Sequence, residues 1–187
     1  MRTGGAYARS FLAWVADNST DAVGKDLMIT PLYRSAAFWT FFGLASGLFY
    51  REFTKLNDHP GGTQLAVVHT HALTLGTLVM LAFLALALLL PHIGNDKRFR
   101  VGFWLWQGGL TLAIAGLLVK GCLQVLGHPM ANSPMIAGFS GLGHMTLTAA
   151  FILFFLGLGR ALKQRPAAGP VTGTPTAADT RTGAATH

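Results

Sequence analysis

Three histidines and a lysine stand inside segments that are otherwise almost purely apolar. His69 and His71 lie near the start of one apolar segment, His144 lies in the first half of another, and Lys120 interrupts a third. An ionisable side chain is costly in hydrocarbon unless it faces the interior of a helical bundle, so such residues are candidates for function by default. Arg51, at the end of a further apolar segment, is expected at the same depth.

The spacing of His69 and His71 gives them different directions. On a straight α-helix two positions that are two residues apart point about 200° from each other, so the two histidines cannot both bind one metal ion. A threonine stripe, Thr70, Thr74 and Thr77, lies between these directions. If the stripe faces the bundle centre, each histidine points toward a different neighbouring helix, and either of them could pair with His144.

Two histidines at one depth on parallel helices can hold a b-type haem by both axial positions. We therefore predict a cofactor site in which His144 and one of His69 and His71 are the ligands, with Arg51 or Lys120 near the haem propionates. A copper or zinc ion is the alternative, with His69, His71 and His144 as candidate ligands, of which only one of His69 and His71 would join His144 at a single ion. That site would need a third or fourth ligand, for which the candidates are His128, Met130 and Cys122.

The composition excludes several classes of protein. Of 187 residues, 51% are apolar and 11% are charged, whereas about 25% are charged in soluble proteins. The net charge is +7, but no basic helix face interleaved with aromatic residues is present, so we expect a lipid bilayer and no nucleic acid as partner. The chain has no GxSxG, Walker-type, HExxH or paired-carboxylate motif. We assign no catalytic residue and expect that the chain is not an enzyme by itself.

The elements that must position these residues are four apolar helices. We predict an all-α, integral membrane four-helix up-down bundle over residues 31–164, with spans at about 31–50, 65–90, 101–126 and 135–158. Residues 1–30 are expected to be a cytoplasmic segment, either disordered or a short helix in the membrane interface. Residues 165–187, rich in Ala, Gly, Pro and Thr, are expected to form a disordered cytoplasmic tail. Phe38-Trp39 and Phe103-Trp104 open the first and third spans, so a further interpretation is that the bundle consists of two similar helical hairpins.

Small residues mark the helix faces that point inward. Gly109, Ala113 and Gly116 share a face with Lys120, and Ser140 and Gly141 lie beside His144. Small side chains let helices approach closely or leave room for a flat cofactor. The pattern predicts that Lys120 and His144 face the interior.

Several strings resemble a known family. GLFYREFTK from Gly47, LAVVHTHALTLG from Leu65, QVLG from Gln124 and GFSGLGHM from Gly138 resemble a small bacterial inner-membrane family with four spans, the domain of unknown function 2871. The resemblance covers about residues 36–162 and implies the class of protein without an activity. The HxHxxxxG string that opens the second span is similar, more distantly, to membrane haem proteins related to the haem-copper oxidases and nitric-oxide response proteins, in which histidines bind haem or metal.

Three functions remain open at this stage. The first is a haem b protein for redox chemistry or sensing, the second handles a metal or small solute, and the third is a structural or accessory subunit without a cofactor. The chain could act alone, as a homo-oligomer or within a larger membrane complex. Translation could begin at Met1 or Met28.

The distribution of basic residues predicts the topology. Lys and Arg stay on the cytoplasmic side of a membrane. The side assigned to the cytoplasm carries Arg2, Arg9, Lys25, Arg34, Lys97, Arg98, Arg100, Arg160, Lys163, Arg165 and Arg181, and the other side carries Arg51 and Lys55. We expect a multi-pass protein of the bacterial inner membrane with both termini in the cytoplasm.

Reporter fusions test this topology. A reporter active only in the periplasm should be silent after Lys163 and active within residues 58–62, because these positions are predicted on opposite sides. Activity of the periplasmic reporter after Lys163 would refute the assignment.

Overall fold

The computed structural model describes the backbone of residues 4–90 and 92–164 and the side chains from Met28 onward. These residues form helices and no strand, which confirms the predicted all-α class. In chain order the elements are α1 (Gly4–Leu56), α2 (Leu65–His71), the π-helical segment η1 (Ala72–Leu78), α3 (Val79–Leu89), the short 3-10 helix η2 (Ile93–Asn95), α4 (Lys97–Val125), the 3-10 helix η3 (Pro129–Asn132) and α5 (Pro134–Lys163).

In the part of the chain that the structure describes, three helical segments are long and apolar enough to cross a membrane. They are Leu65–Leu89, which joins α2, η1 and α3, together with Lys97–Val125 and Pro134–Lys163. Each is longer than the roughly 20 residues that cross a bilayer. They coincide with the predicted second, third and fourth spans. The described part of α1 is less apolar and is not among them. The predicted first span, at about residues 31–50, therefore stays a prediction.

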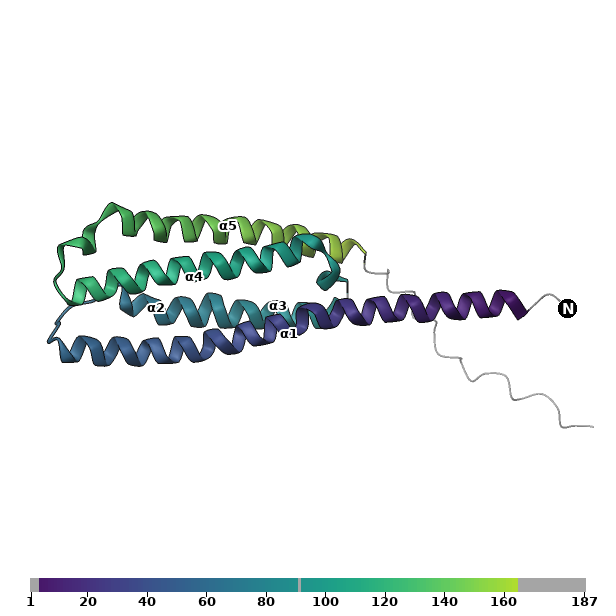
Figure 1. Ribbon diagram of the computed structural model, residues 1–187, viewed down its shortest axis with the longest axis horizontal. Coiled ribbons are helices and arrows are strands. Elements are labelled where there is room, and N and C mark those ends of the chain that lie inside the picture. Colours follow the sequence, from purple (N-terminus) through teal and green to yellow (C-terminus); the bar gives the residue numbers. More distant parts are fainter. Residues whose placement is uncertain (1–3, 91, 165–187) are drawn as a thin grey trace, which may run out of the picture.

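Helix α1 is continuous through the boundary expected at residue 31. Pro31 lies inside this helix of 53 residues, although the first span was predicted to begin at about this residue. A proline removes one backbone hydrogen bond, and here the helix continues through it. The N-terminal part of α1 extends beyond the other helices (Figure 1). The side chains that would form the predicted interfacial face, and the predicted tail of residues 165–187, lie outside the described residues.

Local sequence signals set the ends of α4 and α5. At the start of α4, Asp96 Oδ1 accepts a hydrogen bond of 2.7 Å from the Arg98 amide. At the start of α5, Ser133 Oγ accepts one of 3.3 Å from the Met135 amide, and Pro134 occupies the first turn. These are the residue types preferred at helix N-termini. Gly127, with a φ of +63°, follows α4 in the left-handed conformation common after a helix.

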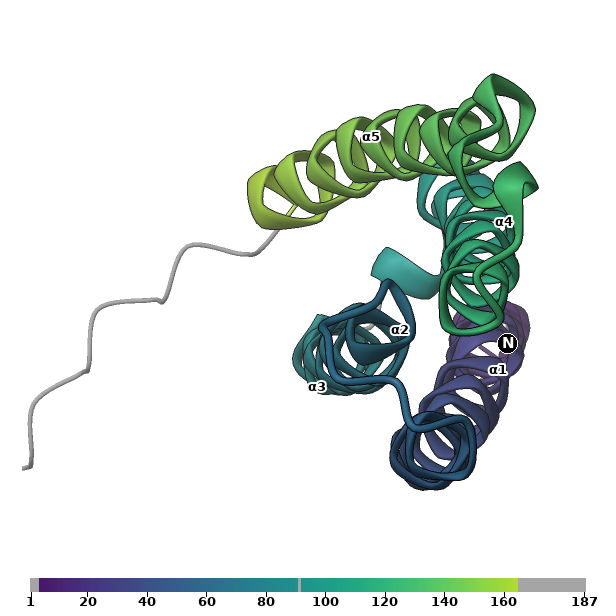
Figure 2. The same ribbon diagram turned by 90° about the vertical axis from the view of Figure 1, so that its left-hand side faces the viewer.

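The helices pack unevenly around the core. Figure 2 shows α4 between α5 and α1, with α2 and α3 beside α1. Helix α5 packs along α4, whereas none of its Cα atoms lies within 8 Å of a Cα atom of α2, η1 or α3. Trp106, Phe99 and Phe154 are fully buried between these elements. The seam between α5 and the α2–α3 segment is therefore bridged by side chains.

Glycines allow the closest helix approaches. A Cβ atom on Gly143 would lie 2.6 Å from the Ala113 amide nitrogen, and one on Gly109 would lie 3.0 Å from the Gly143 carbonyl oxygen. Gly109, Ala113 and Gly116 are buried in α4, against α5, as predicted. On α5, by contrast, His144 and Gly141 are exposed, so the prediction that His144 faces the interior was wrong. Gly76 in η1 likewise leaves no room for a Cβ atom beside Trp39.

We expect Gly143→Ala to destabilise the protein, because the added methyl group meets the α4 backbone, which cannot move aside cheaply. Overpacking of this kind costs roughly 1–3 kcal/mol. Gly138→Ala, on the same helix with nothing within 4 Å of the new methyl group, is the control and should be neutral or stabilising. Thermal unfolding in detergent, followed by circular dichroism, measures both. Equal melting temperatures for the two variants would contradict the close approach.

Candidate functional site

The imidazoles of His71 and His144 meet across the seam between α2 and α5. Their ring centroids are 5.9 Å apart, and the ring planes make an angle of 81°. The backbones of these two helices stay more than 8 Å apart at the Cα atoms. The two histidines are thus a contact made by side chains alone, between residues 73 positions apart in the chain.

Each of these imidazoles is held by its own helix. His71 Nδ1 lies 3.1 Å from the Val67 carbonyl oxygen, and His144 Nδ1 lies 2.7 Å from the Ser140 carbonyl oxygen. A carbonyl oxygen can only accept, so both Nδ1 atoms must carry the proton and donate it. In the neutral rings this leaves Nε2 with a free lone pair on both histidines. Metal-binding histidines are usually held in this way by a carbonyl group behind the ring.

His69 points to another part of the bundle. Its ring lies against Gly47 of α1, where a Cβ atom would be 3.6 Å from His69 Cγ. Its Nδ1 atom is buried and makes no hydrogen bond. The predicted divergence of His69 and His71 toward different helices is confirmed, and His71 is the one that meets His144. The threonine stripe between them does not face the bundle centre, because Thr70 and Thr74 are exposed.

A π-helical turn directly follows His71. In η1 the amide of Val79 bonds to the carbonyl of Thr74, five residues back. The Leu75 carbonyl of this segment accepts a hydrogen bond of 3.1 Å from Trp106 Nε1 on α4. The Trp106 ring packs edge-on against Phe151 of α5, at 4.4 Å between centroids. Short π-helical segments often lie at functional sites, and this one is tied to α4 and, through Trp106, to α5.

Gln107 joins three helices and was missed by the sequence analysis. Its Oε1 atom accepts a hydrogen bond of 2.8 Å from Trp39 Nε1 on α1, and its Nε2 atom donates to Met80 Sδ on α3 at 3.3 Å. A lone amide side chain in an apolar span is the signal that could have found it, because such a group needs a partner within the protein.

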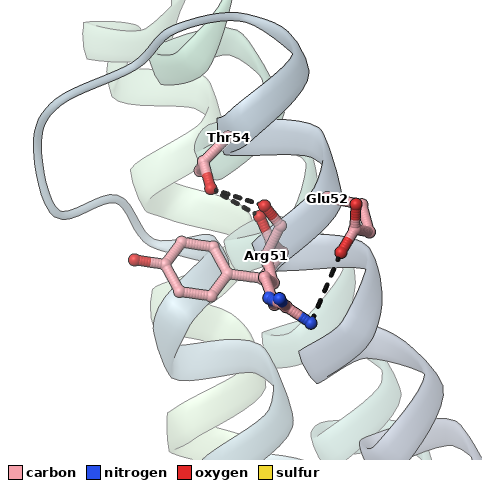
Figure 3. Close-up of polar contacts among 4 residues, drawn as sticks. Arg51, Glu52 and Thr54 are labelled. Carbon is pink, nitrogen blue, oxygen red and sulfur yellow. Dashed lines mark hydrogen bonds and ion pairs between the residues drawn. The ribbon is translucent and has the colours of Figure 1, made fainter.

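Arg51 is not brought to the histidine pair. Its Nη1 atom lies 3.7 Å from Glu52 Oε1, and its side chain is 74% exposed. Figure 3 shows this pair at the end of α1, beside Thr54, whose hydroxyl donates to the backbone carbonyls of Tyr50 and Arg51. Arg51 and Glu52 therefore form an exposed ion pair at the end of α1.

Lys120 is half-buried on α4, one turn beyond Gly116. A Cβ atom on Gly116 would lie 3.1 Å from Ser140 Cβ, and Ser140 provides the carbonyl that holds His144. Lys120 therefore stands near the end of the seam that contains the histidines. No ion pair to Lys120 is found among the described residues, and Glu52 contacts Arg51.

The described residues contain no group of three or more His, Cys, Asp or Glu side chains able to hold a metal ion. The structure thus brings together two of the three predicted metal ligands. His128 has a local role, because its Nδ1 atom accepts a hydrogen bond of 3.2 Å from the Met130 amide. Cys122 is half-buried and free.

Over the described residues the fold is thus all-helical, with three helices able to cross a membrane and two histidine rings in contact. Residues 29–161 match the family described as Protein of unknown function (DUF2871). The chain belongs to this family, as the resemblance implied. Comparison with curated proteins and with solved structures gives no match.

The hydrogen bonds predict the tautomers of three histidines. At pH 8, in protein without added haem, His71 and His144 should carry the ring proton on Nδ1, whereas His128 should carry it on Nε2 because its Nδ1 accepts. Nitrogen chemical shifts of ¹⁵N-histidine-labelled protein, assigned with single His→Gln variants, distinguish the two forms. An Nε2-protonated His71 or His144 would contradict the arrangement.

Proposed function

We propose that this protein binds haem b with His71 and His144 as the axial ligands, and serves in electron transfer or sensing in the membrane. The observation that carries the proposal is that the two imidazole rings meet across the seam, with centroids 5.9 Å apart and ring planes at 81°, while each Nδ1 is held by a carbonyl of its own helix. Both free Nε2 atoms are then available as ligands.

The distance between the rings suits a shared metal ion. Two imidazoles on opposite sides of one ion have ring centres about 6 Å apart, because each metal–nitrogen bond is about 2 Å long. The ring centroids of His71 and His144 are 5.9 Å apart. A haem needs two protein ligands because the porphyrin supplies the others, whereas structural zinc sites need four protein ligands and catalytic ones three. The pair therefore fits a haem better than a bare metal ion.

The surroundings of the pair also suit a flat, largely apolar group. Along α5, Gly141 and Thr148 are exposed on the same face as His144, and a Cβ atom on Gly141 would meet nothing within 4 Å. Thr70 and Thr74 are exposed on the other side of the seam. These small side chains leave the site open laterally. The buried Trp106 and its neighbour Phe151 form an apolar wall between α4 and α5.

When bound by two imidazoles, a haem supplies reversible one-electron oxidation and reduction. The protein's own contribution is to orient the ligands: the carbonyls of Val67 and Ser140 fix the ring directions and make the Nε2 atoms more basic. Lys120 is the cation that we assign to the haem carboxylates, since it is half-buried near this seam. Arg51 is a weaker candidate because it is already paired with Glu52.

We further propose four spans, with residues 31–50 of α1 as the first, in the bacterial inner membrane with both termini in the cytoplasm. Leu32, Ala36 and Trp39 of α1 are buried against the other helices. The opposite face carries exposed large apolar side chains: Tyr33, Phe38, Phe41, Leu44 and Leu48. An apolar outward face is expected where a helix borders lipid.

The visible spectrum tests the haem. Protein produced with adequate haem supply and purified in detergent should show a Soret band and the sharp bands of a low-spin haem after reduction. His71→Ala and His144→Ala should each abolish or convert the low-spin spectrum, because each removes one axial ligand. His69→Ala should keep it, because His69 lies against α1, and it is the matched control.

Circular dichroism and melting temperature establish that each variant is folded. Added imidazole should restore the low-spin spectrum of His71→Gly and His144→Gly, as a free ligand fills the space of the missing ring. A colourless wild-type protein, or a spectrum that responds to His69→Ala and ignores His71→Ala, would overturn the proposal.

A further inference from the structure

A second candidate binding site lies between α1 and α4, at the end of the bundle opposite Arg51. It is a groove of about 450 Å³ lined mainly by Arg34, Ser35 and Phe38 of α1 and by Phe103, Trp104 and Gln107 of α4. It is separate from the histidine pair, which lies between α2 and α5. Phe38, Phe103 and Trp104, which belong to the two aromatic pairs of the sequence, all line this groove.

The groove has aromatic walls, and the charged side chain of Arg34 lies at the end of the groove near the bundle end. Arg34 is exposed, at the end where Lys97, Arg98, Arg100, Arg160 and Lys163 also lie. Phe38 and Trp104 are 59% and 68% exposed, respectively, and Phe103 is buried. A basic group beside exposed aromatic rings is typical of the level where a protein meets lipid headgroups.

A buried hydroxyl in the groove lacks a partner. Ser35 Oγ is shielded from solvent and makes no hydrogen bond. Other hydroxyls in these helices bond to a carbonyl of their own helix, as Thr40 does to Ala36 at 2.8 Å. A buried polar group left without a hydrogen bond lowers stability. Once the Ser35 side chain turns toward the groove, this hydroxyl can donate to a phosphate oxygen beside Arg34.

We propose that the groove binds one anionic phospholipid. Arg34 and the Ser35 hydroxyl hold the phosphate, since a guanidinium is a good phosphate donor, and an acyl chain lies on Phe38, Phe103 and Trp104. The charge of Arg34 matches an anionic headgroup, and the apolar walls favour a lipid over a small soluble anion. The proposal rests on the membrane placement of α1 and not on the haem.

Lipid-dependent stability of the full-length, delipidated protein tests this site. Phosphatidylglycerol should raise the melting temperature by several degrees in detergent, whereas phosphatidylcholine and inorganic phosphate should raise it by less than half as much. Arg34→Gln should lose at least half of the phosphatidylglycerol shift. Arg98→Gln, an exposed arginine at the same end and outside the groove, is the control and should keep it.

Ser35→Ala keeps the charge of Arg34 and removes the hydroxyl, so this variant tests the site if Arg34→Gln does not fold. It should reduce the amount of phosphatidylglycerol that stays bound through purification. This amount is measured as lipid phosphorus. Equal shifts with the two lipids, an equal loss in Arg98→Gln, full stabilisation by inorganic phosphate, or displacement of the lipid by an uncharged quinone would each overturn the proposal. The haem spectrum is a separate readout, so failure of one proposal is distinguishable from failure of the other.

Discussion

In a helix surrounded by hydrocarbon there is no water to bond a polar side chain, so each such group must find its partner within the protein. The threonines of these helices follow this rule by donating to their own backbone: Thr70 to Val67, Thr111 to Gln107, Thr146 to Leu142 and Thr148 to His144. His71 and His144 do the same through Nδ1. The hydrogen bond that satisfies Nδ1 therefore also fixes the tautomer of each ring, and it leaves Nε2 free as a ligand.

The same need explains the bonds that tie the helices together. The π-helical segment after His71 offers the Leu75 carbonyl, and Trp106 on α4 donates to it. Gln107, the next residue, accepts from Trp39 and so connects α4 with α1. Because α2 continues directly into η1, these bonds hold the direction of His71 as well as the packing of the bundle.

The uneven spacing of the helices gives the histidine pair its setting. Glycines bring α4 and α5 into backbone contact, whereas the seam between α5 and the α2–α3 segment is bridged by larger side chains. At one end His71 meets His144, and nearer the other Phe83 packs on Phe154 with 4.1 Å between ring centroids. A seam held apart by side chains can accept a flat group more readily than one closed by glycines.

The sequence by itself determined the all-α class, three long apolar helices and the divergence of His69 and His71. These properties depend on local composition and on the fixed period of a helix. Only the tertiary structure decided that His71 faces His144, that Arg51 pairs with Glu52 instead, that α1 runs unbroken through Pro31, and that Gln107 joins three helices. The rotation of each helix about its axis depends on where its neighbours can approach, as at Gly143 and Gly76, and on the π-helical segment after His71. The hydropathy of the sequence does not report this rotation, because it records how apolar a residue is and not what lies beside it.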